Sequence, residues 1–293
     1  MKKILITGAG KRGFVGKNLK EALCDEYELF TPPHSELELL DYNALESYVK
    51  QNKIEIIIHS AIHVPSVNGA SNEFYNDMTM FMNMEKISRN IEKLIYFGSG
   101  AEFDKRYDIR GVEEDSLGKT IPTSEYGLAK YVMNTIARRS DNIYNLRLFG
   151  IFGKYEDWRV KYLSNICCKT IYGFPLTIRR DCLFDFIYID DLVYAVRSVI
   201  EKDPKYHDYN VCSGKEYSLS FLANEVLRVS GKDVPIVMLS DERNLDYTAS
   251  NKRLLNEMPS FHVTPINEAL TKLYAYYCEH KDEVDPEILK NTR

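Results

Sequence analysis

The chain has 293 residues, and its 38 Lys and Arg against 43 Asp and Glu give a formal net charge of −5. With 44% hydrophobic and 28% charged residues, its composition is that of a globular protein with a sizeable core, not of a disordered or membrane chain. The acidic balance contains no basic block, which argues against nucleic acid or an anionic membrane surface as a partner. No apolar run approaches the roughly 18 residues that span a bilayer.

Short apolar runs alternate with longer amphipathic stretches through the first two-thirds of the chain. Strands are expected at residues 3–7, 27–30, 54–59, 93–97 and 143–148, and helices at residues 15–23, 44–51, 74–89 and 125–138. Strands separated by helices predict right-handed crossovers and a parallel sheet that is buried on both faces. The fold class is therefore α/β, with a Rossmann-type doubly wound parallel sheet.

The pattern changes after about residue 155. Helices are expected within residues 157–171 and at 190–201, 219–229 and 266–280, with short strands at 184–189, 209–212 and 234–239. Asp190 or Asp191 is expected to cap the second of these helices. The polar residues 282–293 are expected to fray. This second part predicts a smaller C-terminal α/β lobe packed against the sheet.

A glycine-rich turn joins the first strand to the first helix. Gly8 ends the strand, and Gly10, Gly13 and Gly16 follow three residues apart, with Phe14 and Val15 at the start of the helix. Such a turn lets the backbone approach a dinucleotide pyrophosphate, while the helix N-terminus offers free N–H groups and a partial positive charge. We therefore predict a dinucleotide at this turn.

Two observations bear on which nicotinamide cofactor the loop would take. An NAD site usually ends its second strand with an acid, but here no acid follows the strand end until Glu36, several residues further on. Lys11 and Arg12 lie inside the loop, where they can reach a 2′-phosphate. The pattern favours NADP(H), with NAD(H) as the alternative. Asp41 is expected either to cap a helix or to contact the adenine.

Three residues with the chemistry for proton transfer converge on the same edge of the sheet. Tyr126 and Lys130 are four apart in a helical stretch, hence on one face, and Ser99 ends the fourth strand. Open α/β sheets bind their ligands at the carboxyl ends of the strands. A nearby ammonium can lower the pKa of a tyrosine, and a serine hydroxyl can stabilise a developing alkoxide.

Together these residues resemble the extended short-chain dehydrogenase/reductase family, in its nucleotide-sugar epimerase/dehydratase/reductase branch. Further matching segments are IIHSAI, FDFIYIDDLVYAV and YNVCSGKEYSLSFLANEV. The resemblance covers about residues 3–280 and is nearest to the keto-sugar reductases related to GDP-fucose synthase and dTDP-rhamnose synthase. It implies Ser99, Tyr126 and Lys130 as catalytic residues and Ser60 and Ala61 beside the cofactor.

The resemblance also implies a division of the chain and its assembly. Residues 1–155 and 187–207 would form the NAD(P)-binding Rossmann domain, and residues 156–186 and 208–293 the lobe that binds a nucleotide-diphosphate sugar. The family commonly forms homodimers through the helices expected here at residues 74–89 and 125–138. A homodimer is therefore expected.

Several departures from the family pattern are informative. The glycine loop carries two extra residues. Gly100 and Ala101 replace the Asp-Glu pair of sugar dehydratases, and Ala101 also stands where GDP-fucose synthases carry a cysteine used in epimerisation. Phe184 and Gly150 replace a common Arg and Asn. The substrate would then be held by Ser99 and Gly100, with its anchor among Arg179, Arg180, Lys154 and Arg159.

These features predict an NADP(H)-dependent 4-keto reductase of a nucleotide-diphosphate sugar, in activated-sugar and surface-polysaccharide biosynthesis. The alternatives are an NAD-dependent C4-epimerase and a non-catalytic NADP-sensing module. No metal site is expected, since His59 and His63 leave a strand and do not share a helix face. Six cysteines without a C-x-x-C pair indicate a cytoplasmic protein with reduced thiols.

Overall fold

The computed structural model describes residues 1–62 and 72–292. Its main element is a six-stranded sheet with the strand order β11-β6-β4-β3-β1-β2, in which all neighbouring strands are parallel. The strands are β1 (Lys3–Thr7), β2 (Glu28–Phe30), β3 (Ile56–His59), β4 (Lys93–Ser99), β6 (Ile143–Leu148) and β11 (Asp208–Val211).

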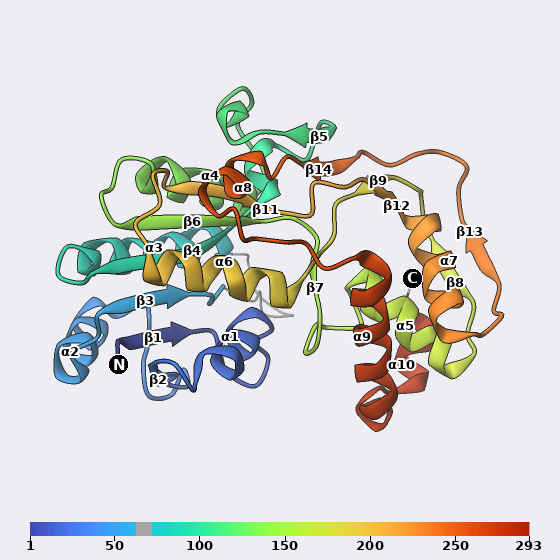
Figure 1. The fold of residues 1–293 in the computed structure, drawn as a ribbon, viewed down its shortest axis with the longest axis horizontal. Coiled ribbons are helices and arrows are strands. Elements are labelled where there is room, and N and C mark those ends of the chain that lie inside the picture. Colours follow the sequence, from blue (N-terminus) through green and yellow to red (C-terminus); the bar gives the residue numbers. More distant parts are fainter. Residues whose placement is uncertain (63–71, 293) are drawn as a thin grey trace.

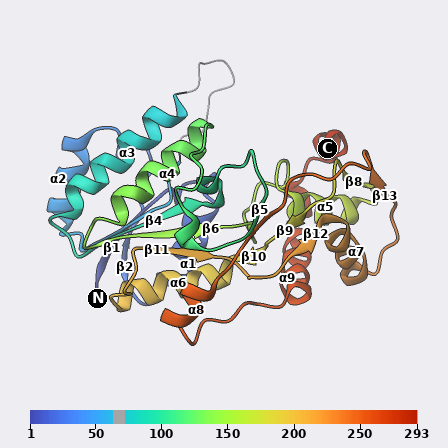
Figure 2. The ribbon, with the colours of Figure 1, turned by 90° about the horizontal axis from the view of Figure 1, so that it is seen from above.

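Helices cover both faces of this sheet. Figure 2 shows one face covered by α2 (Tyr42–Asn52), α3 (Glu73–Ser88) and α4 (Glu125–Ala137), and the other by α1 (Val15–Leu23) and α6 (Ile189–Glu201). Each layer has its own apolar core against the strands. Because both faces are covered, Ile56, Ile57 and Ile58 have no exposed surface. The predicted doubly wound α/β fold is confirmed.

A second group of elements lies beside the carboxyl ends of the strands (Figure 1). It contains a parallel pair of strands, β8 (Leu176–Ile178) and β13 (Ile236–Met238). Around the pair lie α5 (Tyr162–Tyr172), α7 (Leu219–Ser230), α9 (Ile266–Glu279) and α10 (Pro286–Asn291). This is the predicted smaller lobe.

A four-stranded sheet joins the two groups, and we refer to it as the bridging sheet. Its order is β12-β9-β14-β5, and Figure 1 shows it running from β5 above the large sheet to β12 beside α7. The strands are β5 (Ile109–Val112), β9 (Leu183–Phe184), β12 (Tyr217–Ser218) and β14 (Tyr247–Ala249). The sequence did not predict this sheet, because its strands have only two to four residues and pair across long sequence separations.

The single strand expected at residues 184–189 is two strands in the structure. After β9, the chain leaves the bridging sheet and forms β10 (Ile187–Tyr188), which pairs in parallel with β7 (Ile151–Phe152). A short helix, α8 (Lys252–Glu257), follows β14. Three 3-10 turns cover Gly100–Phe103, Glu114–Ser116 and Lys281–Glu283.

One part of the predicted division of the chain needs correction. Residues 208–293 were assigned to the smaller lobe, but β11 pairs along its length with β6 at the edge of the large sheet. Its side chains explain the pairing, since Asp208 and Asn210 both accept hydrogen bonds from the buried Arg147 of β6. The remaining boundaries stay a prediction.

Two local predictions were wrong. Helix α6 begins at Ile189 with no side-chain cap, and the Asp191 carboxylate accepts bonds from the backbone and hydroxyl of Thr264 instead. Residues 286–291 of the segment expected to fray form α10 instead, which buries Leu289 completely and is capped by Asp285. An amphipathic turn with an N-cap outweighed the polar composition on which the prediction rested.

Candidate active site

The glycine-rich turn between β1 and α1 is built around close backbone approaches. Gly8 has a positive φ of 75°, and a Cβ on it would lie 2.7 Å from the backbone of Ser60 and Ala61. A Cβ on Gly16 would lie 2.6 Å from the Gly8 carbonyl oxygen, and one on Gly13 would overlap the same oxygen. These three positions therefore require glycine. Gly10 has open space around it and accepts a bond from the Gly13 N–H at 2.8 Å.

This turn fits the phosphates of a dinucleotide. Helix α1 starts at Val15, and its N-cap residue Phe14 supplies no side-chain acceptor to the first-turn N–H groups. Those donors and the partial positive charge of the helix end are what a phosphate binds. Ser60 and Ala61, which follow β3, lie against Gly8 and bond to Thr7 across the strands. The structure thus brings the predicted cofactor residues of two strands together.

Lys11 and Arg12, which are predicted to select the cofactor, are exposed in the loop. No carboxylate pairs with either of them among residues 1–62 and 72–292. Strand β2 ends at Phe30 with no acid beside it. Asp41 caps α2 by accepting from the N–H groups of Asn43 and Ala44, which is the first of its two predicted roles. Its contact with an adenine stays a prediction.

The three predicted catalytic residues come from β4 and α4. Ser99 is the last residue of β4, and its hydroxyl caps the 3-10 turn that follows by accepting from Ala101 N at 3.2 Å. Tyr126 and Lys130 lie on the first two turns of α4, which Ser124 caps. The Lys130 ammonium is buried and donates to the Phe97 carbonyl of β4 at 3.0 Å. It lies 5.7 Å from the centre of the Tyr126 ring.

Burial dominates the protonation of this cluster. It raises the pKa of Tyr126 to about 12, although an interaction with the Ser99 hydroxyl opposes the rise. Burial also lowers the pKa of Lys130. The expected lowering of the Tyr126 pKa by Lys130 is therefore not produced by the chain's own residues. Tyr126 is a protonated phenol at neutral pH, which makes it a proton donor.

His59 connects the glycine turn with the catalytic cluster. Its Nδ1 atom lies 2.9 Å from the Thr7 hydroxyl, one residue before Gly8. Burial, together with the smaller effect of the Lys130 charge, lowers the pKa of His59 to about 3. His59 is therefore neutral and packs between the ends of β1 and β4. His63, the other histidine of this segment, lies outside the described residues.

A buried ionic network below Ser99 was not anticipated. Glu102, fully buried, accepts from the Ser99 backbone N–H at 3.1 Å and from Arg147 Nε at 2.7 Å. Arg147 is also fully buried and reaches Asp208 at 2.9 Å. Burial raises the pKa of Glu102, against the effect of the Arg147 charge. The network fixes the end of β4, and the Ser-x-x-Glu spacing of a capping box was the available sequence signal.

Aromatic side chains surround the Ser99 end of the site. The centre of the Tyr247 ring lies 5.0 Å from that of Phe149 and 4.8 Å from that of Phe184. The Tyr247 Oη atom lies 3.4 Å from Ser99 Oγ. Gly100 lies below Tyr247. Phe184, which stands where the family often has an arginine, thus contributes an apolar wall. Tyr247 was not a predicted site residue, because β14 itself was not predicted.

The predicted substrate anchors are distributed differently. Arg180 pairs with Glu242, Arg159 with Asp157 and Lys154 with Glu21. Arg179 is exposed, and no contact joins it or Arg180 to Ser99, Tyr126 or Lys130 in the described part of the chain. Arg180 instead borders a hollow of about 530 Å³ with Asp108, Arg243 and Asp246. The role of both arginines stays a prediction.

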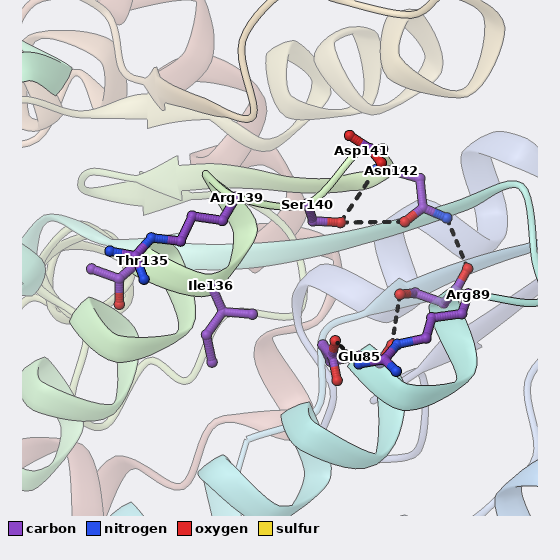
Figure 3. A pocket seen from close by; sticks show the side chains of 9 residues that line it. Glu85, Arg89, Thr135, Ile136, Arg139, Ser140, Asp141 and Asn142 are labelled. Carbon is purple, nitrogen blue, oxygen red and sulfur yellow. Dashed lines mark hydrogen bonds and ion pairs between the residues drawn. The ribbon is translucent and has the colours of Figure 1, made fainter.

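One hollow lies away from these residues. It has about 660 Å³ and lies at the C-terminal ends of α3 and α4, whereas Tyr126 is at the N-terminal end of α4 (Figure 3). Its side chains largely bond to one another, as in the Arg89–Glu85 pair. It holds no predicted site residue.

Within residues 1–62 and 72–292, no group of three or more His, Cys, Asp or Glu side chains is placed to hold a metal ion. No helix in this part of the chain combines the length and apolar character needed to cross a membrane.

The fold and the cluster together define the class of protein: a Rossmann-type α/β fold with Ser99, Tyr126 and Lys130 at the edge of its large sheet. The chain belongs to the NAD dependent epimerase/dehydratase family, whose model matches residues 4–212. It is 25% identical to GDP-L-colitose synthase of Yersinia pseudotuberculosis over 96% of this chain and 99% of that protein. It is 25% identical to GDP-L-fucose synthase of Sinorhizobium fredii over 76% and 79% of the two chains.

Solved structures show the same fold. A GDP-L-fucose synthetase from Naegleria fowleri superposes with a TM-score of 0.82 at 17% identity, covering 96% of this chain and 94% of that one. A UDP-glucose 4-epimerase from Thermotoga maritima, solved with UDP-glucose, gives a TM-score of 0.80 at 17% identity, over 95% and 99% of the chains. The predicted family is confirmed.

Proposed function

We propose that this protein is an NADP(H)-dependent reductase that converts the 4-keto group of a nucleotide-diphosphate sugar to a hydroxyl, in activated-sugar and surface-polysaccharide biosynthesis. The observation that carries the proposal is the cluster of Ser99, Tyr126 and Lys130 beside the glycine turn. The relatives named for colitose and fucose synthesis, and a dTDP-4-dehydro-6-deoxyglucose reductase from Escherichia coli that is 24% identical, support a keto-sugar substrate.

The roles of the three side chains follow from their protonation and placement. In this chemistry the hydride comes from the bound dinucleotide. Tyr126, kept protonated by its raised pKa, delivers a proton to the C4 oxygen as the alkoxide develops. Ser99 donates a hydrogen bond to the same oxygen. Lys130, held by the Phe97 carbonyl, carries its charge beside Tyr126 and would bind the ribose next to the nicotinamide.

The preference for NADP(H) rests on the loop cations. Lys11 and Arg12 carry two charges that no carboxylate neutralises within residues 1–62 and 72–292, and no acid stands directly at the end of β2. A 2′-phosphate would pair with those charges, whereas a ribose 2′-hydroxyl gains most from an acid at the end of the second strand.

The two alternatives differ from reduction in what they require of the cofactor and of Tyr126. A C4-epimerase, as two relatives are named, keeps its cofactor bound and oxidised through the cycle. Purified protein that retains NAD⁺ and interconverts sugars without added cofactor would establish the epimerase. A non-catalytic sensing module would not need Tyr126 at all.

We also propose that the chain forms a cytoplasmic homodimer, with no nucleic acid or membrane partner. Helix α3, one of the two helices expected at the dimer interface, exposes Tyr75 and Met82. Large apolar side chains exposed on one helix are suited to an interface.

Oxidation of NADPH in the presence of GDP-, dTDP-, UDP- and CDP-linked 4-keto-6-deoxy sugars tests the function. We expect Tyr126→Phe to lower kcat by at least about 100-fold, since general acid catalysis contributes that much. Tyr131→Phe, which removes a hydroxyl from the next turn of α4, should stay within about twofold. The proposal fails if the unmodified protein turns over no keto sugar, or if Tyr126→Phe retains full activity.

A further inference from the structure

Tyr247 reaches the catalytic cluster from the distant end of the chain. It begins β14 in the bridging sheet and lies 148 residues beyond Ser99 in sequence, yet its Oη atom is 3.4 Å from Ser99 Oγ. The side chain is only 8% exposed. Tyr126 is near enough to Tyr247 that a negative charge on ionised Tyr126 would raise the pKa of Tyr247. Ser99 thus lies between two phenol groups, of which only Tyr126 belongs to the predicted catalytic set.

The position of this hydroxyl is fixed by its surroundings. The Tyr247 ring packs against Phe149, with ring centres 5.0 Å apart, and against Phe184 at 4.8 Å. Below it, a Cβ on Gly100 would overlap the Tyr247 hydroxyl, so the glycine leaves the space that the hydroxyl occupies. The aromatic wall and the glycine therefore hold the phenol oxygen against Ser99.

The direction of the hydrogen bond follows from the available partners. Ser99 Oγ is the one hydrogen-bonding group in reach of the Tyr247 hydroxyl within residues 1–62 and 72–292. If Tyr247 accepted from Ser99, its own buried proton would have no acceptor there, which is unfavourable. On geometry alone either hydroxyl could donate, and only donation by Tyr247 to Ser99 gives the Tyr247 proton an acceptor. The separation is long for an O–H···O bond, as catalytic hydrogen bonds often are before substrate binds.

Ser99 then has only one way to direct its own proton. A serine oxygen has two lone pairs, and here one accepts from Ala101 N–H and the other from Tyr247. The Ser99 O–H must then point away from both donors, and Tyr126 is the other hydroxyl that interacts with Ser99. Donation by Tyr247 also polarises the Ser99 hydroxyl and makes it a stronger donor.

We propose that Tyr247 is a positioning residue, which donates to Ser99 and so directs the Ser99 proton at the C4 oxygen of the substrate. The inference rests on the proposed reductase function and extends it to a residue of the bridging sheet. Because β14 pairs with both β5 and β9, the strand that carries Tyr247 connects the two lobes at the point of proton transfer.

Steady-state kinetics of Tyr247→Phe, Ser99→Ala and the double variant test this role. Tyr247→Phe keeps the packed ring and removes only the donor, so we expect kcat to fall about 10-fold, with KM for the keto sugar within about twofold. In the Ser99→Ala background the same change should have no further effect, because Tyr247 acts through Ser99. The control is Tyr277→Phe, which removes a buried hydroxyl that bonds to the Glu156 carbonyl, far along the chain in α9. It should leave kcat unchanged.

Each other outcome has a distinct meaning. An unchanged kcat in Tyr247→Phe, a rise in KM alone, or an equal loss in the Ser99→Ala background would overturn the positioning role while the reductase function stands. Absence of turnover by the unmodified protein on every keto sugar would overturn the reductase function, and the positioning role with it.

Discussion

Gly16 offers a direct test of how the glycine turn is built. Replacement by alanine would normally stabilise a helix by up to about 1 kcal/mol. Here the added Cβ would lie 2.6 Å from the Gly8 oxygen, and 2.7 Å from both the Gly8 carbon and the Ser60 hydroxyl oxygen. Real Cβ atoms essentially never come closer than 3.0 Å, so the turn must move by about 0.4 Å.

The steric effect is the larger of the two. Overpacking of this kind costs about 1–3 kcal/mol, against a gain in helix propensity of up to about 1 kcal/mol, so the middle of these ranges leaves Gly16→Ala less stable by about 1 kcal/mol. We expect a fall in Tm of about 2 °C. Displacing the turn also moves the N–H groups that would hold the pyrophosphate, so the Kd for NADPH should rise about 10-fold or more.

Thermal unfolding without cofactor and titration with NADPH measure the two effects. Gly10→Ala is the matched comparison, since it adds the same methyl group to the same loop with nothing within 4 Å. It should keep the Tm of the unmodified protein, and its Kd reports whether Gly10 itself approaches the cofactor. A Gly16→Ala variant with unchanged Tm and unchanged Kd would refute the steric reasoning.

Two further predictions concern charge. Replacing Lys11 and Arg12 together by serine should raise the Kd for NADPH by about 10-fold or more, while the Kd for NADH stays within about twofold. Equal losses of affinity in titrations with both cofactors would contradict contact of these residues with a 2′-phosphate. Burial raises the pKa of Glu156 to about 7, so the folded chain keeps a proton between about pH 4.5 and 7 that the unfolded chain releases. The stability from this group is present below pH 4.5 and lost as the pH rises through 7. Between pH 4.5 and 8, the free energy of unfolding of Glu156→Gln, measured in urea, should therefore rise relative to that of the unmodified protein by up to about 3 kcal/mol. A difference between the two proteins that does not change with pH would contradict this prediction.

Local sequence patterns determined the large sheet. Strands β1 and β6 and helix α1 lie at the predicted residues, and the other predicted strands and helices of the first 150 residues begin and end within about two residues of their predicted limits. These elements have long apolar or amphipathic periods, which report burial on one or both faces directly. The glycine turn was equally readable, because close backbone approach leaves no choice of residue at Gly8, Gly13 and Gly16.

The cluster of Ser99, Tyr126 and Lys130 was predictable for a related reason. A parallel sheet brings the carboxyl ends of its strands to one edge, and a spacing of four residues places Tyr126 and Lys130 on one helix face. Their protonation was not predictable in this way. The pKa of Tyr126 rises because the side chain is buried. The degree of burial depends on tertiary packing and cannot be derived from the sequence alone.

Only the tertiary structure decided how the second lobe meets this cluster. The strands of the bridging sheet are too short to show a period, and they pair over separations of more than 100 residues between β14 and β5. The bridging sheet brings the Tyr247 hydroxyl next to Ser99 and the Phe184 ring next to Tyr247. The pairing of β11 with β6 likewise brings Asp208 next to Arg147. Contacts between distant segments depend on the packing of the whole chain, whereas helices and strands follow from neighbouring residues. The sequence therefore determined the catalytic edge of the sheet, and the packing of the whole chain determined what faces it.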